Sequence, residues 1–328
     1  MKFRTEIQIN TEFPKIKHGK GLYFTGSCFS ENIGAKLAEL KFDVLCNPFG
    51  ITYNPASILK EIKTIAHPKE IREEFILQDN GTFFHYDFHS RIHAKSKVDL
   101  IQIMQSAAEE GFGHIEKGEW VFITLGTAVI YRLIESGKIV GNCHKQASHN
   151  FQKDILRVSE VSACVEEIIT RLKKINSTIK ICFTVSPVKH LRDSAELNAR
   201  SKSTLIAAIH ETIQHHANTF YFPAFEIMNE DLRDYRFYAS DMMHPSEQAI
   251  NYIFEKFSAC FFDDETNRLL HQIVKIQKLG QHRPLHASAD ANLYIRNKGL
   301  KMIEDLCEEK VGLDFEAERK YFYDLSPE

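Results

Sequence analysis

Short apolar runs alternate with amphipathic stretches along most of the chain. Five runs have the length and the aromatic and β-branched content of buried strands, and six stretches repeat apolar residues every three or four positions, as helices do. This alternation predicts parallel strands joined by helical crossovers. We therefore expect an α/β fold, a three-layer flavodoxin-like sandwich around a parallel five-stranded sheet. The expected strands are 21–25, 42–46, 120–125, 180–185 and 219–225, and the expected helices are 29–40, 55–66, 96–110, 159–175, 193–216 and 246–262.

Two segments interrupt this alternation and have the pattern of β-hairpins. Residues 75–92 contain Asn80-Gly81 between two alternating stretches, and Asn-Gly is a strong signal for a tight hairpin turn. Residues 129–140 alternate in the same way and turn at Ser136-Gly137. We expect both hairpins as insertions in loops of the central sheet.

The last part of the chain differs from the rest. After Asp263 it is mostly charged and helical, with a turn expected near residues 281–284. We therefore expect two parts in the chain. The first is a core over residues 1–263 that includes the hairpins, and the second is a C-terminal helical extension over residues 264–328 that packs on the core.

Composition and charge limit the class of protein. The 328 residues are 43% hydrophobic, enough for a sizeable core, and their net charge of −3 gives no field for a nucleic-acid partner. No run approaches the roughly 18 apolar residues that span a bilayer. Residues 1–20 are polar and contain Pro14, so we expect neither a secretory signal nor a membrane segment. Seven irregularly spaced cysteines favour free thiols, which indicates a cytoplasmic protein.

The most informative segment is Gly26-Ser27-Cys28, where a buried strand passes directly into a helix. A side chain at such a turn lies at a helix N-terminus, where free N–H groups and the helix dipole favour negative charge. This environment suits a thiolate or an oxyanion, so Ser27 and Cys28 are candidate nucleophiles. The alternative is a serine N-cap followed by a buried cysteine.

Asp241 and His244 form the second candidate group. They follow the fifth expected strand and precede a helix whose first turn suits Pro245. Because they are three residues apart around a loop, the carboxylate can accept the imidazole N–H while the other ring nitrogen faces a nucleophile. The alternative is an aspartate helix cap beside a surface histidine.

Two further groups have less specific patterns. His85, Asp87 and His89 alternate along an expected strand and so share one face, either as part of a metal site or as the polar face of the hairpin. We favour the polar face and expect no metal. Cys143 and His144 are neighbours in the loop after the second hairpin, and neighbours on extended chain point in opposite directions, which disfavours a direct nucleophile–base pair.

Taken together, the Gly26 turn and the Asp241-to-Pro245 segment resemble the SGNH (GDSL-type) hydrolase superfamily, whose fold is flavodoxin-like. More narrowly, Gly26-Ser27-Cys28-Phe29-Ser30 is similar to the motif of the GSCFA-domain family. The resemblance covers nearly the whole chain. Its further matches are Asn47-Pro48-Phe49-Gly50, Tyr53-Asn54-Pro55, Leu125-Gly126-Thr127, Asn142-Cys143-His144-Lys145 and His282-Arg283-Pro284.

The resemblance implies catalytic roles for individual residues. Aligned without a gap, the first superfamily motif places the nucleophile at Cys28, and a shift of one residue places it at Ser27 instead. We favour Cys28, since a thiol at a helix N-terminus ionises more readily than a hydroxyl. Asp241 and His244 correspond to the acid–base pair that moves the proton.

The resemblance also implies an oxyanion hole and a substrate-binding surface. Gly50 corresponds to a glycine whose N–H binds the oxyanion. Ala128 stands where the superfamily has an asparagine, and losing that donor costs about 3 kcal/mol of transition-state stabilisation unless another group replaces it. The candidates for this replacement are Asn142, Asn47 and Thr127. The other residues expected to line the site are Gly126, His144 and His89.

These patterns predict acyl transfer to water. His244, oriented by Asp241, takes the proton from Cys28 or Ser27 as that group attacks an ester carbonyl, and the acyl-enzyme is then hydrolysed. The expected substrate is a small-molecule or carbohydrate ester, without a cofactor, and the oligomeric state stays open. Two alternatives also stay open: an inactive protein that binds a carbohydrate or acyl group on this scaffold, and a thiol-dependent acyltransferase.

Overall fold

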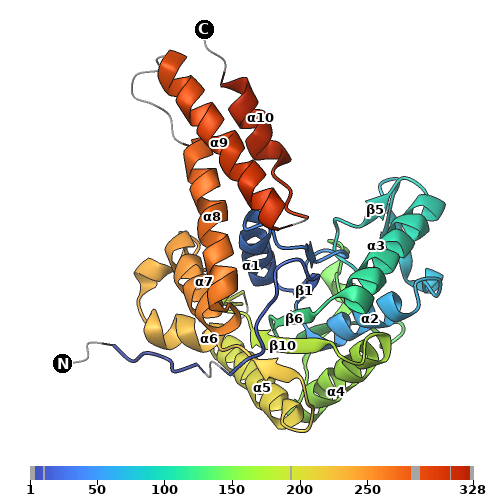
Figure 1. Cartoon of the computed structure of the whole chain (residues 1–328). Coiled ribbons are helices and arrows are strands. Elements are labelled where there is room, and N and C mark those ends of the chain that lie inside the picture. The colour runs from blue at the N-terminus through green and yellow to red at the C-terminus, as the bar shows by residue number, and fades with distance from the viewer. Residues whose placement is uncertain (1–3, 10–11, 193, 282–288, 311, 326–328) are drawn as a thin grey trace.

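A five-stranded parallel sheet forms the centre of the structure (Figure 1). The computed structural model describes residues 4–9, 12–192, 194–281, 289–310 and 312–325. The order of the strands is β11-β10-β6-β1-β2, which is the flavodoxin-like order and confirms the expected fold class. The strands are β1 (Leu22–Gly26), β2 (Val44–Cys46), β6 (Trp120–Leu125), β10 (Lys180–Val185) and β11 (Thr219–Tyr221).

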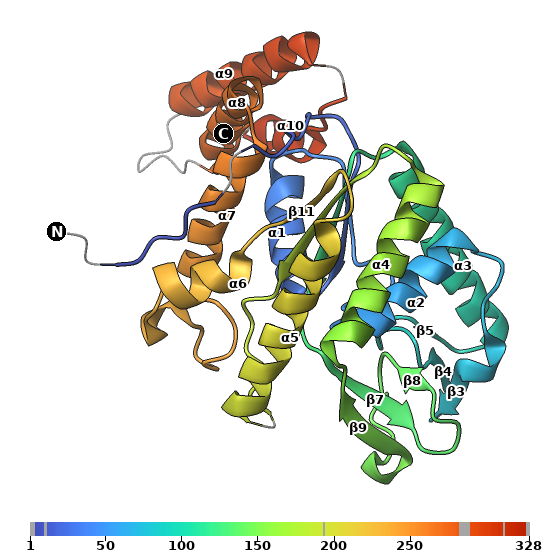
Figure 2. The same ribbon diagram turned by 90° about the horizontal axis from the view of Figure 1, so that it is seen from below.

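Helices cover both faces of this sheet (Figure 2). Side chains alternate along β1, so Leu22 and Phe24 pack with α1 and α7, whereas Tyr23 packs with α2, α3, α4 and α5. The two hydrophobic clusters that result are the two interfaces of a three-layer fold. The helices that form the outer layers are α1 (Cys28–Glu39), α2 (Pro55–Ala66), α3 (Lys97–Lys117), α4 (Val158–Ile175), α5 (Ala195–Ile213) and α7 (Glu247–Phe261).

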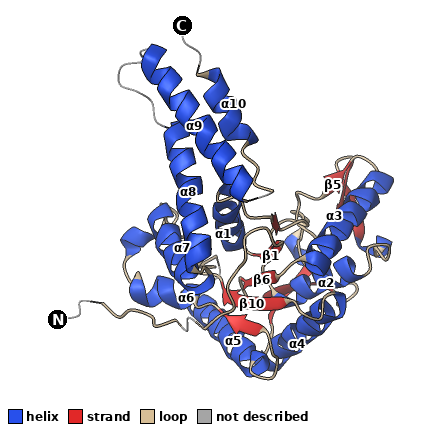
Figure 3. Cartoon of the chain, in the orientation of Figure 1, coloured by secondary structure: helices blue, strands red, loops and turns tan. Residues whose placement is uncertain are grey.

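Two small antiparallel sheets extend from the loops of the central sheet (Figure 2), whose strands are red in Figure 3. Asn80 and Gly81 both have positive φ values, of 47° and 72°, as the tight turn between β3 and β4 requires. Each expected hairpin gains a third strand, β5 or β9, that the sequence pattern did not predict. The strands are β3 (Ile76–Asp79), β4 (Thr82–His85) and β5 (His93–Ala94) in one sheet, and β7 (Val129–Leu133), β8 (Ile139–Val140) and β9 (Phe151–Ile155) in the other.

Three helices follow the core and lie side by side, projecting beyond the sheet (Figure 1). They are α8 (Asp264–Gln281), α9 (Ala289–Glu309) and α10 (Glu316–Asp324). Their apolar residues join the hydrophobic cluster that also contains α1 and α7. Lys41 of the core forms an ion pair with Glu318 at 2.7 Å. The turn expected after Gln281 and the His282-Arg283-Pro284 match lie outside the described residues.

The ends of some elements differ from the sequence prediction. The fifth strand ends at Tyr221 because the chain turns at Pro223 into the short helix α6 (Ala224–Glu226) and the π-helical turn Ile227–Asp231. Short 3-10 turns occupy Glu73–Phe75, Ser148–Asn150 and Tyr235–Phe237. None of the helices in the described part of the chain combines the length and the apolar content needed to cross a lipid bilayer.

Candidate active site

The turn after β1 is built around Gly26. Its φ is +125°, and a Cβ atom placed there would lie 2.1 Å from the Thr124 carbonyl oxygen, so this position needs glycine. The Ser27 N–H donates to that same carbonyl at 3.2 Å, which ties the turn to β6. Helix α1 then begins at Cys28. The first two candidate nucleophiles therefore lie at the carboxyl edge of the sheet, where this fold binds its ligands.

Ser27 is fully buried and serves as the N-cap of α1. Its exposed fraction is 0%, and its Oγ accepts a hydrogen bond from the Phe29 N–H at 3.3 Å. The hydroxyl donates to Ser186 Oγ at 3.0 Å. Both interactions are typical of a structural cap rather than of a group that meets a substrate.

Cys28 is half-buried at the first position of α1. Burial raises the pKa of its thiol and Glu31 adds to this, while the N–H groups of Cys28 and Phe29 and the charge of Lys202 oppose the shift. The helix N-terminus thus favours the thiolate as the sequence suggested, but burial outweighs it. In the free protein burial thus raises the thiol pKa above its ordinary value, because a partly buried charge loses hydration. The preference for the Cys28 thiol over the Ser27 hydroxyl stays a prediction.

Asn47 supports the Gly26 turn from the end of β2. Its Oδ1 accepts a hydrogen bond from the Gly26 N–H at 2.9 Å. Its side chain is only 6% exposed, and among the described residues its Nδ2 has no hydrogen-bond partner. A buried donor without a partner is uncommon in proteins, and here it lies next to the turn that carries Cys28.

Gly50 and His89 lie in direct contact beside this turn. The φ of Gly50 is +79°, and a Cβ atom placed there would lie 2.5 Å from the His89 Cβ. The Gly50 N–H donates to the Asn47 carbonyl at 2.7 Å, so it is engaged within the turn. Burial lowers the pKa of the His89 ring, and the neighbouring Arg91 charge lowers it further. This imidazole is therefore neutral at neutral pH.

Gly126 and Thr127 form the loop after β6. Their N–H groups both donate to the Tyr53 carbonyl, at 2.7 and 3.1 Å. The Thr127 hydroxyl lies 2.9 Å from Ser201 Oγ and also accepts from the Val129 N–H at 3.1 Å. These bonds hold the loop against α5 and leave the Thr127 hydroxyl well occupied.

Asp241 and His244 form a hydrogen-bonded pair on an exposed loop. The His244 Nδ1 lies 2.6 Å from Asp241 Oδ2, and Asp241 Oδ1 accepts from the N–H groups of His244 and Met243, each at 2.9 Å. Mainly through the N–H groups of His244 and Met243, these bonds lower the pKa of Asp241 to about 2. The pair has the geometry of an oriented imidazole with an ionised partner.

The loop that carries His244 is tied to the loop after β10. The Lys189 N–H donates to the Met243 carbonyl at 3.0 Å. Lys189 is three residues after Ser186, whose hydroxyl accepts a hydrogen bond from Ser27. Both loops lie at the carboxyl side of the sheet. Within the part of the chain that the structure describes, no hydrogen bond joins the His244 ring to Ser27 or Cys28. The side chain of His244 is 48% exposed.

His85, Asp87 and His89, expected on one strand, have separate structural surroundings. The structure ends β4 at His85, so the expected strand through Asp87 and His89 is wrong. Lys60 and Arg72 each contact the Asp87 carboxylate at 2.5 Å. Across the described ranges, no three His, Cys, Asp or Glu side chains are grouped closely enough to hold a metal ion.

Asn142 and His144 are positioned by similar bonds. The His144 Nε2 lies 2.8 Å from the His85 carbonyl, and its Nδ1 lies 3.3 Å from Ser90 Oγ. Asn142 Oδ1 accepts from the His144 N–H at 2.8 Å. Burial lowers the pKa of His144 and raises that of the Cys143 thiol. These contacts link the two small sheets and are typical of a structural role.

A cavity of about 230 Å³ lies beside the loop after β6. Tyr53 borders it, and burial, together with the Cys28 charge, raises the pKa of Tyr53. Cys28 itself is not one of the lining residues. The His190 ring meets the Tyr53 ring edge-on at 5.5 Å between centroids. The lining residues are Tyr53, Asn54, Thr127, Val129, Tyr131, Val140, Gly141, His190, Arg192, Leu197, Asn198 and Ser201.

The sequence analysis did not single out Ser186, His190 or Lys202, although all three belong to this region. Ser186 directly follows β10, a buried strand that the pattern predicts correctly, and His190 lies further along the same loop. Polar residues just after each parallel strand are a signal that could have found them, because strand ends meet at one edge. Lys202 is inside a helix, and nothing in its sequence context indicates burial.

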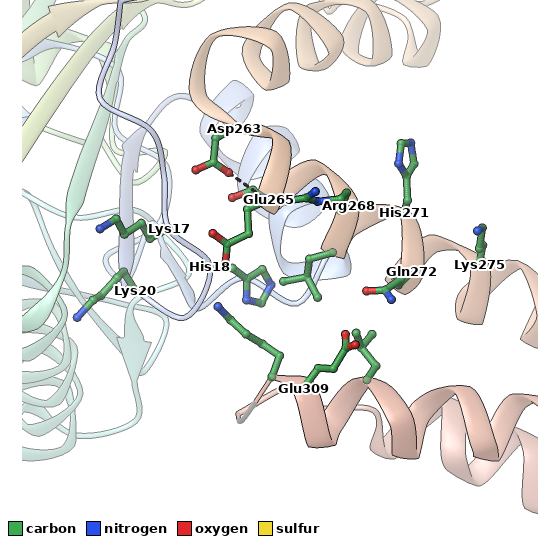
Figure 4. A pocket seen from close by; sticks show the side chains of 14 residues that line it. Lys17, His18, Lys20, Asp263, Glu265, Arg268, His271, Gln272, Lys275 and Glu309 are labelled. Atoms are coloured by element: carbon green, nitrogen blue, oxygen red, sulfur yellow. Dashed lines mark hydrogen bonds between the residues drawn. The ribbon is translucent and has the colours of Figure 1, made fainter.

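A larger hollow of about 830 Å³ lies away from this region, between the segment before β1 and the C-terminal helices (Figure 4). Basic side chains from Lys17 and Lys20 and from α8 border it, together with acidic Asp263, Glu265 and Glu309. It shares no lining residue with the cavity beside Tyr53.

Comparisons with known proteins identify one family. The model of the GSCFA family matches residues 21–257. No curated protein matches the chain. Two solved structures are similar: a carbohydrate esterase family 3 from Talaromyces cellulolyticus (11% identity, 51% of this chain and 66% of that chain, TM-score 0.28) and the acetyl xylan esterase Est2A from the rumen bacterium Butyrivibrio proteoclasticus (10%, 79% and 65%, TM-score 0.40). The chain spans just under two thirds of the length of these structures.

Proposed function

Since the chain belongs to the GSCFA family, we propose that it is an acyl ester hydrolase of the SGNH type whose nucleophile is Cys28. The observation that carries this proposal is the contrast between two neighbouring residues. Ser27 is sealed and used as a helix cap, whereas Cys28 is half-buried at the start of α1, at the carboxyl edge of the sheet. This difference in burial supports Cys28 rather than Ser27 as the group that meets a substrate.

The proposed reaction uses the groups around this turn. The Cys28 sulfur attacks the ester carbonyl, and the Asn47 Nδ2, a buried donor without a partner among the described residues, supports the developing oxyanion together with backbone N–H groups at the start of α1. His244, oriented by Asp241, takes the thiol proton as the sulfur attacks and then gives this proton to the leaving alcohol. The same imidazole then takes a proton from the water that hydrolyses the acyl-enzyme.

The cavity beside Tyr53 supports a small acyl group on a polar alcohol. Its volume of about 230 Å³ is below that of most drug-sized sites, which suits an acetyl-sized group with part of its alcohol. The aromatic rings of Tyr53 and Tyr131 and the polar groups of Asn54 and Asn198 border it. Flat rings beside amide groups suit a sugar, so an acylated carbohydrate is the proposed substrate class.

Turnover and acyl-enzyme trapping test this proposal together. Wild-type protein is mixed with p-nitrophenyl acetate and with an acetylated sugar, and intact-mass spectrometry of the quenched mixture looks for a single added acetyl group. We expect hydrolysis of both esters and acetylation at Cys28, with neither in Cys28→Ala. Hydrolysis that persists in Cys28→Ala, or an acetyl group found at Ser27, would contradict the assignment.

Two observations favour a second function. No hydrogen bond between Cys28 and the His244 ring is present among the described residues, and the pKa of the Cys28 thiol is raised. An inactive protein that binds an intact ester would show both features. Binding of the acetylated sugar measured by calorimetry, without hydrolysis or labelling, would support this alternative.

A further inference from the structure

The loop that carries His244, residues 235–246, folds back on itself in two limbs. The first limb includes Tyr238 and Ala239, and the second includes His244 and Pro245. The Ala239 N–H donates to the His244 carbonyl at 2.7 Å, and Tyr238 faces Pro245 in an isolated β-bridge. Because these contacts join the two limbs, the loop places the His244 ring as one unit.

Lys189, in the loop after β10, contacts both limbs. Its N–H donates to the carbonyl of Met243, at the start of the second limb, at 3.0 Å. Its Nζ lies over the Tyr238 ring of the first limb, 3.9 Å from the ring centroid, and 5.3 Å from the centroid of the Tyr235 ring. The backbone and the side chain of this one residue thus join the edge of the sheet to the two sides of the His244 loop.

The ammonium group of Lys189 has aromatic rings as its partners. In the described ranges of the chain no ion pair joins its Nζ to a carboxylate, and the nearby Asp234 is paired with Arg236 at 3.8 Å. A cation within about 6 Å of a ring centroid is attracted by the negative charge of the ring face. The Lys189 side chain therefore holds the Tyr238 ring instead of neutralising an acidic group.

A hollow of about 350 Å³ borders the first limb. Lys189, Tyr235 and Tyr238 line it, together with residues 228–230 and 232–234. Tyr238 also packs against the hydrophobic cluster that contains α1 and α7. Because the hollow leaves packing around this limb incomplete, the contact with the Lys189 side chain restricts movement of the limb into the open space.

The position of the His244 ring depends on the position of its loop. The ring nitrogen Nδ1 lies 2.6 Å from Asp241 Oδ2, and Asp241 belongs to the same loop. This bond orients the ring within the loop but does not fix the loop relative to the sheet. We propose that the Lys189 side chain is a positioning residue for His244, which holds the loop, and with it the imidazole, at the carboxyl edge of the sheet.

This inference rests on the proposed function in taking His244 as the group that moves the proton. Its test therefore combines ester turnover with hydrogen exchange of the backbone amides in residues 237–246. Exchange reports local opening of the loop and needs no ester hydrolysis. If wild type hydrolyses no ester, the proposed function fails, while the exchange measurements still decide whether Lys189 holds the loop.

The first measurement is the turnover of p-nitrophenyl acetate by wild type, Lys189→Met and Lys189→Arg. Methionine keeps an unbranched side chain without the charge, whereas arginine keeps a cation that can lie over the ring. We expect kcat to fall about tenfold in Lys189→Met with KM nearly unchanged, and Lys189→Arg to restore most of the loss. Measurable turnover with equal kcat in wild type and Lys189→Met would overturn the proposal.

The second measurement is hydrogen exchange of the same three proteins, followed by mass spectrometry. In Lys189→Met we expect exchange in residues 237–246 to become about tenfold faster, because the first limb opens more often. Lys189→Arg should exchange at nearly the wild-type rate. Unchanged exchange of this segment in Lys189→Met would overturn the proposal, whatever the turnover.

Matched variants separate the role of this contact from a general loss of a charge. Lys298 of α9 also lies over a tyrosine, with Nζ 5.4 Å from the centroid of the Tyr294 ring, and Lys298→Met should keep wild-type kcat and exchange. Tyr238→Leu removes the ring that Lys189 contacts. The double variant Lys189→Met/Tyr238→Leu should therefore show no larger change than either single variant.

Changes that multiply in the double variant would show that the lysine and the ring act separately, and would overturn the proposal. The same holds if Lys298→Met changes kcat and loop exchange as much as Lys189→Met does. Circular dichroism checks that each variant is folded. Should Lys189→Met be unfolded, Lys189→Gln, which also lacks the charge, takes its place in both measurements.

Discussion

The Ser27 hydroxyl donates a hydrogen bond to the Ser186 hydroxyl at 3.0 Å, which joins the turn after β1 to the turn after β10. These strands are separated by β6 in the sheet, so the bond crosses above its carboxyl edge. It holds Ser27 as a helix cap and leaves the next residue, Cys28, at the edge of the site. The same bond connects the Gly26-Ser27-Cys28 turn to the residue whose carbonyl accepts from Lys202 Nζ.

Replacing Ser27 should therefore affect stability more than catalysis. Ser27→Ala removes the cap of α1 and a buried hydrogen bond, and we expect the free energy of unfolding to fall by about 1–2 kcal/mol. Turnover of p-nitrophenyl acetate should stay within a few-fold of wild type, while Cys28→Ala abolishes it. Urea unfolding and steady-state kinetics measure the two effects. A folded Ser27→Ala protein without activity would make Ser27 the nucleophile.

Asp241→Asn should weaken proton transfer without removing the loop structure. An asparagine oxygen can still accept the N–H groups of Met243 and His244, but it loses the charge that stabilises the imidazolium. We expect kcat to fall at least about 100-fold, with KM nearly unchanged. Since the pKa of Asp241 is about 2, its protonation should not produce the acid limb of the wild-type pH–rate profile. Equal kcat values in wild type and His244→Ala would remove both residues from the mechanism.

Asn47→Asp tests the proposed oxyanion donor. The substitution keeps an oxygen for the Gly26 N–H and replaces the Nδ2 donor. We expect kcat to fall by about 100- to 1,000-fold, with a small change in KM. Asn142→Asp is the comparison, because Asn142 Oδ1 is already bound to the His144 N–H. A larger loss of kcat in Asn142→Asp than in Asn47→Asp, with both proteins folded by circular dichroism, would transfer the role to Asn142.

Glu61 should make stability depend on pH. This residue of α2 is 1% exposed, and its Oε1 accepts from the Tyr23 and Thr25 hydroxyls at 3.0 and 2.9 Å, beneath the Gly26 turn. Burial raises its pKa from 4.5 to about 7. The folded state thus binds a proton that the unfolded state has already lost between these pH values, so this contribution is full below the unfolded pKa and is lost as pH rises through the folded one.

Glu61→Gln measures this effect directly. The variant resembles the protonated carboxyl at every pH, so it should gain up to about 3 kcal/mol over wild type at pH 8 and little at pH 4. Urea unfolding at the two pH values gives the difference. Glu110→Gln, on the exposed side of α3, is the control for a generic loss of charge. Parallel stability curves for wild type and Glu61→Gln would show that the pKa of Glu61 is the same in the folded and unfolded states.

Local patterns predicted most of the fold. The apolar runs place all five strands of the central sheet, and Asn80-Gly81 places the β3–β4 turn, because both signals depend on neighbouring residues. The third strands β5 and β9 were missed. Strand β5 is only two residues long, so it has almost no pattern of its own. Strand β9 pairs with β7, from which β8 and the following loop separate it in sequence.

The sequence by itself determined the sheet, its helical layers and the Gly26-Ser27-Cys28 turn, since repeat period and glycine position act within a few residues. Only the tertiary structure decided that Ser27 is sealed, that the Asn47 Nδ2 has no hydrogen-bond partner in the described part of the chain, and that Lys202 and Glu61 are buried. Burial and pKa depend on which surfaces pack together across the whole fold. The same lysine or glutamate on a helix is charged in water and can become neutral in the core, and no local pattern distinguishes the two cases.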